Sequence, residues 1–292
     1  MRVSVDCICP FPVMTAVITT SIQNKRGVFA ESRSNARRRN PLCGHSLCAG
    51  KICENRRMAV DKHSEPSNWH LMKRALIIGS SGGIGSAIAA ELRGNGTEVD
   101  TLSRSENGFD LTDPQTVEDA LQPLSEPYDL VLVATGALEI NGAAPEKSVR
   151  AISAKAMADQ FAVNAIGPAL ILRHAMRLLP KDSWSVFAVL SARVGSIGDN
   201  QIGGWVSYRA AKAAVNQIVH TGAIELARTH PHAICVTLHP GTVQTAFTEK
   251  YLGRHPSVPA QEAAQNLLRV VSGLNVDDTG GFFDWAGKRV PW

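Results

Sequence analysis

Short hydrophobic runs alternate with helical patterns from residue 73 to the end of the chain. The clearest runs, at 75–78 and 130–133, are continuous, which is typical of strands buried on both faces of a parallel sheet. The runs predict strands at 75–78, 99–103, 109–111, 130–133, 185–190, 233–238 and 281–284, with helices at 84–92, 116–121, 153–179, 208–228 and 262–271. This alternation predicts an α/β fold, a doubly wound and mostly parallel sheet of the Rossmann type in a single domain.

The first 71 residues show no such periodicity. We therefore expect residues 1–71 to be a disordered or poorly structured leader and residues 72–292 to be the domain. Arginines at 37–39, scattered serines and few acids leave an organelle transit peptide open. A start at Met72 or Met58 is the other interpretation. Cys43, Cys48 and Cys53 do not have the usual spacing of zinc ligands, and we expect no metal.

Charge is divided unevenly between these two parts. The chain has 292 residues and a net charge of +4, of which residues 1–71 carry +6 and the remainder −2. A slightly acidic domain argues against nucleic acid as a partner. No apolar stretch has the length of a membrane helix, so no membrane partner is expected. Cys235 is the one cysteine after residue 71, which fits a cytoplasmic protein, or an organellar one if the leader is a transit peptide.

A glycine-rich turn joins the first predicted strand to the first predicted helix. Its pattern is Gly-x-x-x-Gly-x-Gly, with Gly79, Gly83 and Gly85 at the defining positions. Such a turn lets the backbone approach a pyrophosphate, and the helix N-terminus that follows attracts phosphate. The position between strand and helix predicts dinucleotide binding. The loop residues expected at the cofactor are Gly79, Ser80, Ser81, Gly83, Ile84 and Gly85.

The end of the second predicted strand indicates which dinucleotide is bound. NAD-specific sites place a carboxylate roughly 20 residues after the glycine turn. This chain has Ser103 and Arg104 there. An arginine pairs with the 2′-phosphate of NADP, whereas a carboxylate would repel it. The expected cofactor is therefore NADP(H).

Tyr208 and Lys212 stand four residues apart in a predicted helix. Residues at this spacing share one helix face. An ammonium beside a phenol stabilises the phenolate, and we expect it to lower the pKa of Tyr208. Tyr208 would then exchange a proton as a general acid or base.

Together these motifs resemble the short-chain dehydrogenase/reductase superfamily, in the branch that contains the bacterial C-factor and the insect carbonyl reductase sniffer. The likeness covers residues 72–292. The matching residues are Gly79–Gly85, 110–112, 164–168, 193–197, 203–205, 208–212, 240–243 and 291–292.

The resemblance implies a hydride transfer between nicotinamide and a carbonyl or alcohol substrate. Tyr208 would protonate the carbonyl oxygen, Lys212 would hold the ribose, and Asn164 would anchor a water in the proton relay. It also implies a homodimer or homotetramer. Further cofactor contacts are expected from Asp110, Leu111, Ala134, Thr135, Gly136, Pro240, Gly241, Val243 and Thr245.

Two departures from the family pattern leave alternatives open. Where paired serines are usual, this chain has Ser191 followed by Ala192, so Ser191 or Ser196 would polarise the carbonyl, or that stabilisation is weaker. The loop at 134–137 also differs from the usual pattern. A non-catalytic dinucleotide-binding signalling or sensor module is therefore the alternative function. A third idea, a sugar-nucleotide epimerase, is disfavoured because too little chain follows Lys212 for a separate substrate lobe.

The segment at 245–259 is the remaining prediction. It would lie over the active site as a lid, or be an ordinary exposed loop. Its mixture of aromatic and basic residues, among them Phe247, Tyr251, Arg254 and His255, would make a partly apolar pocket with room for a cationic contact.

Overall fold

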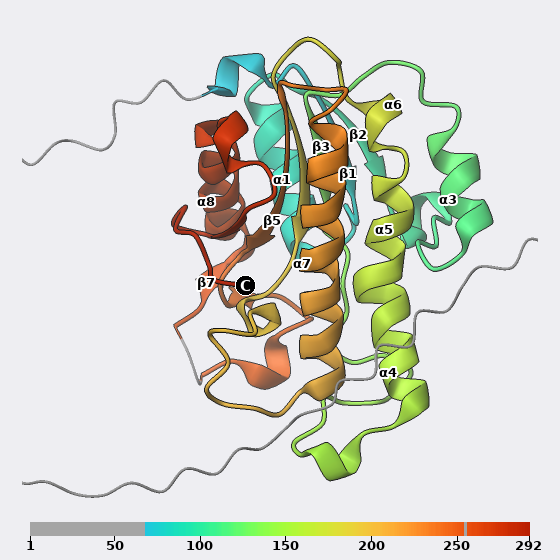
Figure 1. Cartoon of the computed structure of the whole chain (residues 1–292), viewed down its shortest axis with the longest axis vertical. Coiled ribbons are helices and arrows are strands. Elements are labelled where there is room, and N and C mark those ends of the chain that lie inside the picture. The colour runs from blue at the N-terminus through green and yellow to red at the C-terminus, as the bar shows by residue number, and fades with distance from the viewer. Residues whose placement is uncertain (1–67, 254–255) are drawn as a thin grey trace, which may run out of the picture. The chain divides into compact units, whose positions relative to one another are not determined.

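Six parallel strands form the central sheet of the computed structural model, which describes residues 68–253 and 256–292 (Figure 1). Within these residues the strand order is β2-β1-β3-β4-β5-β8, which matches the predicted doubly wound, parallel sheet. A second, two-stranded sheet pairs β6 (Val243–Gln244) with β7 (Val258–Pro259). The strands of the large sheet are β1 (Arg74–Ile78), β2 (Glu98–Leu102), β3 (Leu130–Val133), β4 (Ser185–Leu190), β5 (Ala233–His239) and β8 (Phe282–Asp284).

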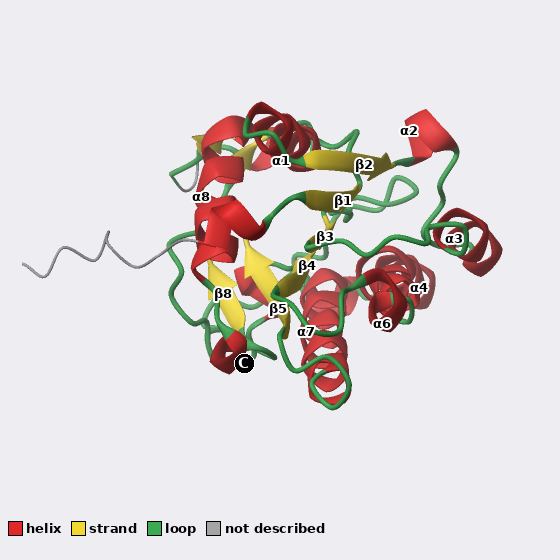
Figure 2. Cartoon of the chain, turned by 90° about the horizontal axis from the view of Figure 1, so that it is seen from above, coloured by secondary structure: helices red, strands yellow, loops and turns green. Residues whose placement is uncertain are grey.

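Helices cover both faces of the large sheet. Figure 2 shows α1 and α8 on one side and α3, α4, α6 and α7 on the other. Each side has its own hydrophobic core, because strand residues alternate between the two faces. The helices are α1 (Gly83–Gly94), α2 (Arg104–Asn107), α3 (Pro114–Leu121), α4 (Ala154–Phe161), α5 (Gly167–Leu172), α6 (Ala175–Leu178), α7 (Val206–Leu226) and α8 (Ala260–Gly273).

The predicted short strand at 109–111 is wrong. Its residues form no strand, and the large sheet ends at β2. The carboxylate of Asp110 accepts hydrogen bonds from the backbone N–H of Thr112 at 2.9 Å and from its hydroxyl at 2.7 Å. This local bond turns the chain where a strand would have to continue.

The long helix predicted over 153–179 is also wrong, because it is broken into several pieces. After α4 comes a π-helical segment, Ala162–Ile166, and α5 and α6 follow as separate short helices. Pro168 causes the first irregularity, since it has no N–H to bond to the carbonyl of Asn164 four residues earlier. The N–H of Gly167 instead bonds to the carbonyl of Ala162, five residues back.

The described residues begin at Asn68, four positions before the predicted boundary at Met72. Asn68–Leu71 forms a 3₁₀ helix, and the Asn68 amide donates to the carbonyl of Leu274 at 3.1 Å. Trp69 packs against the core beside α8. These two side chains therefore contact the domain, and the predicted boundary at Met72 stays a prediction. Residues 1–67, with the predicted leader and its cysteines, lie outside the described residues.

Two searches of the described residues gave negative results. None of their helices combines the length and the apolar character that crossing a bilayer requires. Within the same residues there is no group of three or more His, Cys, Asp or Glu side chains that could hold a metal ion.

Candidate active site

A continuous groove runs across the carboxyl ends of the strands. It consists of two cavities of about 660 Å³ and about 320 Å³, which share residues of the glycine turn and of the loop after β3. In the sheet β2 and β3 lie on opposite sides of β1, so the order of the strands reverses at β1. The groove lies at this point, where doubly wound sheets bind ligands. The shared lining residues are Ser81, Gly82, Ala134, Thr135 and Gly136.

The glycine turn has the backbone that the sequence predicted. Gly79 has a positive φ of 91°, which side-chain-bearing residues rarely adopt. A Cβ on Gly85 would lie 2.3 Å from the Gly79 carbonyl oxygen, so only glycine permits this close approach. Gly82, the N-cap of α1, provides no side-chain cap. The first N–H groups of α1 therefore have no capping side chain and suit a pyrophosphate.

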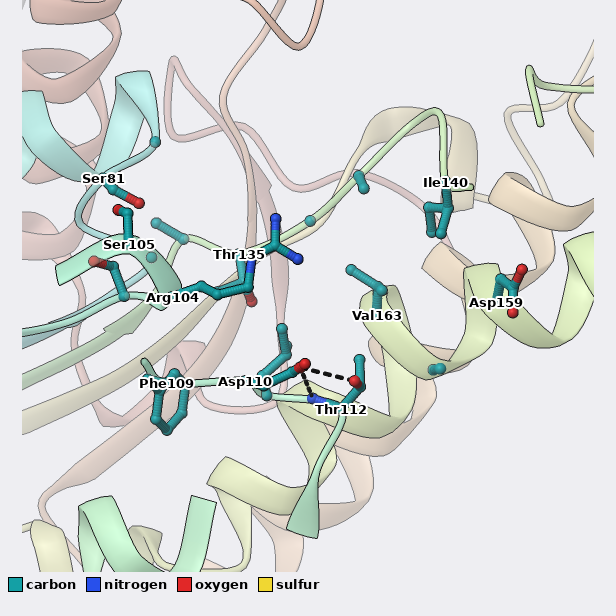
Figure 3. A pocket seen from close by; sticks show the side chains of 18 of the residues that line it. Ser81, Arg104, Ser105, Phe109, Asp110, Thr112, Thr135, Ile140, Asp159 and Val163 are labelled. Atoms are coloured by element: carbon teal, nitrogen blue, oxygen red, sulfur yellow. Dashed lines mark hydrogen bonds between the residues drawn. The ribbon is translucent and has the colours of Figure 1, made fainter. Parts of the chain in front are cut away.

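The larger cavity has the predicted adenosine-side residues in its lining. Ser103, Arg104, Asp110 and Leu111 all contribute. Figure 3 shows Arg104 extending into the cavity beside Thr135, with Asp110 bonded to Thr112 below it. Hydrogen bonds from Thr112 hold the pKa of Asp110 below its usual value, so this carboxyl is ionised at neutral pH.

Glu106 is a residue that the sequence reasoning missed. Its carboxylate accepts hydrogen bonds from the hydroxyls of Ser80 at 2.8 Å and Ser103 at 3.0 Å. Glu106 thereby joins the glycine turn to the start of α2, where Arg104 lies. The spacing Ser103-x-x-Glu106 is that of a helix capping box, a signal by which the sequence could have revealed it.

Tyr208 and Lys212 lie together on α7, as predicted, and both line the smaller cavity. The Lys212 ammonium lies 5.8 Å from the centre of the Tyr208 ring and donates to the Leu190 carbonyl at 3.0 Å. Burial lowers the pKa of Lys212 to about 8.

The expected lowering of the pKa of Tyr208 is wrong for this structure. Burial of the phenol raises its pKa above the ordinary value. Desolvation disfavours the charged phenolate, and the Lys212 ammonium is directed to the backbone of β4. Tyr208 is therefore protonated at neutral pH, which is the form that donates a proton.

Asn164 lies behind the groove in the π-helical segment and is fully buried. Its amide accepts from the N–H of Ala137 at 3.2 Å and donates to the carbonyl of Ala137 at 2.9 Å. The side chain therefore holds the loop after β3. The predicted role of Asn164 in anchoring a water stays a prediction.

Gln160 was not predicted, although it stands four residues before Asn164 at helical spacing. Its amide oxygen accepts from Asn164 Nδ2 at 2.7 Å, and its Nε2 donates to the Leu138 carbonyl at 2.9 Å. Gln160 is buried. It completes a network that connects α4, Asn164 and the loop after β3.

Replacing Gln160 by leucine is expected to lower the free energy of unfolding by about 1–3 kcal/mol, because a buried N–H of Asn164 and the Leu138 carbonyl lose their partner. Urea unfolding followed by circular dichroism measures this change. The matched control is Gln122→Leu at an exposed position, which should differ from the wild type by less than about 0.5 kcal/mol. Equal stability of both variants would contradict the network.

Ser191, and not Ser196, lines the cavity with Tyr208 and Lys212. The Ser191 hydroxyl is buried without a protein partner, so it is available to a bound molecule. The hydroxyl of Ser196 instead accepts from the backbone N–H of Asp199 at 3.1 Å. Of the two serines that the sequence left open, Ser191 has the position required to polarise a carbonyl.

The segment after β6 closes one end of the smaller cavity. Thr245, Ala246, Phe247 and Thr248 contribute to its lining. These residues border the cavity, and whether the segment acts as a lid stays a prediction; Arg254 and His255 lie outside the described residues.

The same segment is tied across the groove to the loop after β3. The carboxylate of Glu139 accepts from the Lys250 ammonium at 2.7 Å and from the Tyr251 hydroxyl at 2.9 Å. The Tyr251 ring also lies 5.4 Å, centre to centre, from that of Trp205, which in turn lies 6.3 Å from that of Tyr208. These contacts join the lid to the base of α7 beside the candidate general acid.

Most of the predicted site residues therefore converge on one groove. Ser80, Gly85 and Asn164 are buried behind it and act through the loops that they hold. The predicted residues that line the groove are Gly79, Ser81, Gly83, Ile84, Ser103, Arg104, Asp110, Leu111, Ala134, Thr135, Gly136, Ser191, Tyr208, Lys212, Pro240, Gly241, Val243 and Thr245.

Comparison with known proteins agrees with this geometry. The profile of the family described as short chain dehydrogenase matches residues 106–254, which is half of the chain. The chain belongs to the short-chain dehydrogenase family. Its sequence is 36% identical to C-signal of Myxococcus xanthus over 137 residues, which are 47% of this chain and 78% of that protein.

A second relative of this short-chain dehydrogenase matches over a longer stretch. It is 1-hydroxy-2-glutathionyl-2-methyl-3-butene dehydrogenase of Rhodococcus sp. (strain AD45), 28% identical over 236 residues that cover 76% of this chain and all of that protein. Both relatives are therefore matched over most of their own length.

Two solved structures share the fold of this short-chain dehydrogenase. The carbonyl reductase Sniffer of D. melanogaster has a TM-score of 0.66 at 18% identity, covering 76% of this chain and 100% of that one. The NADPH-bound carbonyl reductase from chicken fatty liver has a TM-score of 0.64 at 20% identity, covering 78% and 100%. The predicted Rossmann-type fold is confirmed, and the chain is an oxidoreductase of this family that uses a nicotinamide dinucleotide.

Proposed function

We propose that this chain reduces a carbonyl compound to an alcohol with NADPH. The proposal rests on one observation: Tyr208, Lys212 and Ser191 line the same cavity at one end of the groove. The glycine turn lines both cavities of that groove. The Tyr208 hydroxyl is protonated at neutral pH and can therefore donate a proton to the substrate oxygen. Relatives whose names and titles say dehydrogenase and NADPH-bound carbonyl reductase support the same reaction.

The residues of the groove fit a dinucleotide. The first N–H groups of α1 have no capping side chain, and the buried hydroxyls of Thr135 and Ser191 have no protein partner. Gly79, Ser81, Gly83 and Ile84 would hold the pyrophosphate, Arg104 a 2′-phosphate, and Lys212 a ribose hydroxyl. When bound, the dinucleotide supplies the hydride.

The chain's own groups would do the rest of the chemistry. The Ser191 hydroxyl donates a hydrogen bond to the carbonyl oxygen of the substrate and so stabilises the negative charge that develops there. The Tyr208 hydroxyl donates its proton to the same oxygen, which becomes the alcohol. The Lys212 ammonium, 5.8 Å from the centre of the Tyr208 ring, would turn from the Leu190 carbonyl toward the resulting phenolate and stabilise it until a proton from solvent replaces the one that was lost. The lid segment with Phe247 excludes water from the apolar side of the cavity.

The direct test is the oxidation of NADPH by the purified full chain with benzaldehyde, acetophenone and menadione as probes. Turnover of one of them with formation of the alcohol or hydroquinone is the expected result. Tight binding of NADPH with no turnover on any probe would favour the non-catalytic sensor. The alternative is not favoured, because the groove brings together the general acid, its lysine and a free serine hydroxyl.

Arg104 carries the preference for NADPH over NADH in this proposal. Replacing it by methionine keeps the aliphatic stem and removes the charge, so kcat/KM with NADPH is expected to fall about 10–100-fold through loss of a charge-assisted hydrogen bond. The value with NADH should change less than about threefold, since NADH has no 2′-phosphate. The control is Arg150→Met, at an exposed position away from the groove. A parallel loss with both cofactors would contradict the role of Arg104.

Two further predictions concern the oligomeric state of the enzyme and its location in the cell. We propose a homodimer or homotetramer, supported by exposed apolar side chains on the helical face, with Ile166 at 51% and Ile224 at 53% exposure. Sedimentation analysis of the full chain would measure the oligomeric state. A cytoplasmic location stays a prediction, with an organelle as its alternative.

A further inference from the structure

The helix α2 has a single turn and begins at Arg104, whose side chain reaches into the larger cavity (Figure 3). None of the four residues of α2 is buried. A helix this short has little stability of its own, because its one turn carries the whole cost of nucleation. The position of Arg104 therefore depends on the bonds that tie α2 to the rest of the domain.

In the part of the chain that the structure describes, one side-chain hydrogen bond leads from α2 to another element, and it comes from Glu106. Its Oε2 accepts from the hydroxyl of Ser80 in the glycine turn at 2.8 Å, and the same oxygen accepts from the Ser103 hydroxyl at 3.0 Å. Both serines are buried, at 5% and 2% exposure, whereas Glu106 lies at the surface. Two shielded hydroxyls thus share one charged acceptor, which makes stronger hydrogen bonds than a neutral one.

Helix capping alone does not explain the direction of the Glu106 side chain. In a capping box, the side chain of the third helical residue accepts from the backbone N–H of the N-cap. Here that N–H, of Ser103, donates instead to Asn107 Oδ1 at 3.1 Å. The Ser103 hydroxyl accepts from the N–H of Glu106 at 3.2 Å and so completes the cap. The Glu106 carboxylate is thereby left to bond to a residue 26 positions earlier, in the glycine turn.

We propose that Glu106 is a positioning residue for cofactor selection: by binding Ser80 it holds α2 against the glycine turn, so that Arg104 meets the 2′-phosphate of NADPH while Ser81 meets its pyrophosphate. The proposal rests on the proposed function, because it needs Arg104 to bind that phosphate. Arg104 and Ser81 both line the larger cavity, and Glu106 lines neither cavity of the groove. Glu106 therefore acts through the two segments that it joins and does not touch the cofactor.

The negative charge of Glu106 makes this role distinguishable from a direct one. A carboxylate beside the 2′-phosphate would repel it and disfavour NADPH. Residues two positions apart in a helix do not face each other, and Glu106 is directed to Ser80 while Arg104 extends into the cavity. We therefore expect removal of Glu106 to weaken NADPH binding, whereas a residue that only repelled the phosphate would strengthen it when removed.

Hydrogen–deuterium exchange of the cofactor-free full chain measures the tie itself. The N–H groups of Asn107 and Gly108 bond to backbone carbonyls at the start of α2, at 3.0 Å and 3.1 Å, so their exchange reports how often the turn opens. Glu106→Met and Ser80→Ala should each speed this exchange by about threefold or more. The matched control is Glu262→Met, at an exposed position in α8, which should leave it unchanged. Unchanged exchange in both variants of the tie would overturn the proposal.

Dissociation constants for NADPH and NADH, measured by titration of the full chain without substrate, test the selection. Glu106→Met should weaken NADPH binding about tenfold and NADH binding less than about threefold, through the lost hydrogen bond to a charged group. Glu106→Gln, which keeps an acceptor oxygen, should stay within about threefold of the wild type for both cofactors. In an Arg104→Met background, Glu106→Met should weaken NADPH binding no more than NADH binding.

The outcomes separate this inference from the proposed function. Tighter binding of NADPH by Glu106→Met, or equal weakening of both cofactors, would show that Glu106 does not select through Arg104. If Arg104→Met leaves the NADPH dissociation constant unchanged, the proposed role of Arg104 is wrong, and the exchange measurement alone decides whether Glu106 holds α2. If the binding results are as expected but the wild type reduces none of the carbonyl probes, the proposed reduction is wrong and the role of Glu106 stands.

Discussion

Tyr208→Phe should lower kcat for carbonyl reduction by about 10²–10⁴-fold, the usual contribution of a positioned general acid. The phenylalanine ring keeps the packing of the buried tyrosine and removes only the hydroxyl. Trp205 and Lys212, which both lie against the ring, keep their positions. The rate of NADPH oxidation and the NADPH dissociation constant are the quantities to measure, and the second should change far less than the first.

Tyr128→Phe is the matched control for this prediction. Tyr128 is also fully buried, but its hydroxyl donates to Asp100 at 2.7 Å, and it lines neither cavity of the groove. This variant should lose about 0.5–3 kcal/mol of unfolding free energy and retain its kcat. Tyr208→Phe should behave in the opposite way, with stability within about 1 kcal/mol of the wild type. Full activity of Tyr208→Phe would remove the basis of the oxidoreductase mechanism.

Lys212→Met should abolish reduction and at the same time stabilise the cofactor-free protein at neutral pH. The folded chain holds the ammonium in a buried position, which lowers its pKa from 10.5 to about 8. A shift of this size corresponds to a penalty on the order of 3 kcal/mol in the folded state. Methionine has a similar length and no charge, so the penalty disappears, together with the hydrogen bond to Leu190.

The effect of Lys212 on the unfolding free energy depends on pH. Below about pH 8 Lys212 is protonated in both the folded and the unfolded chain, and the whole penalty is present. Between about pH 8 and pH 10.5 the unfolded chain binds more protons at this lysine, so the contribution of Lys212 to the unfolding free energy rises with pH. Above that window the penalty is gone.

Urea unfolding at several pH values therefore measures a difference between Lys212→Met and the wild type that is largest near neutrality and shrinks as pH rises. The control is Lys181→Met at an exposed position, for which the difference should stay within about 0.5 kcal/mol at every pH. A Lys212→Met protein that is less stable than the wild type at neutral pH would show that the ammonium stabilises the empty fold. The burial of Lys212 would then not lower the stability of the protein.

The strands and the glycine turn could be predicted because their signals are local. A run such as residues 130–133 is buried on both faces in the structure, as its continuous apolar pattern indicated. Tyr208 and Lys212 share a helix face because four residues make about one helical turn. Two local signals were not used in the prediction: the capping-box spacing of Ser103 and Glu106, and Pro168, which argues against one continuous helix over 153–179.

The remaining features depend on residues that are distant in sequence. Glu139 meets Lys250 and Tyr251 more than a hundred positions later, and the N–H of Ser191 reaches the Leu238 carbonyl only through the pairing of β4 and β5. No local pattern encodes such a pair.

The sequence by itself determined the alternation of strands and helices, the dinucleotide turn and the tyrosine–lysine pair, since each depends on residues within a few positions of one another. Only the tertiary structure decided which serine lines the cavity with Tyr208 and Lys212, where the sheet ends and in which direction the pKa values of these two residues move. Those outcomes depend on burial and on contacts between separate elements, and both arise only when the sheet and its two helical layers pack together.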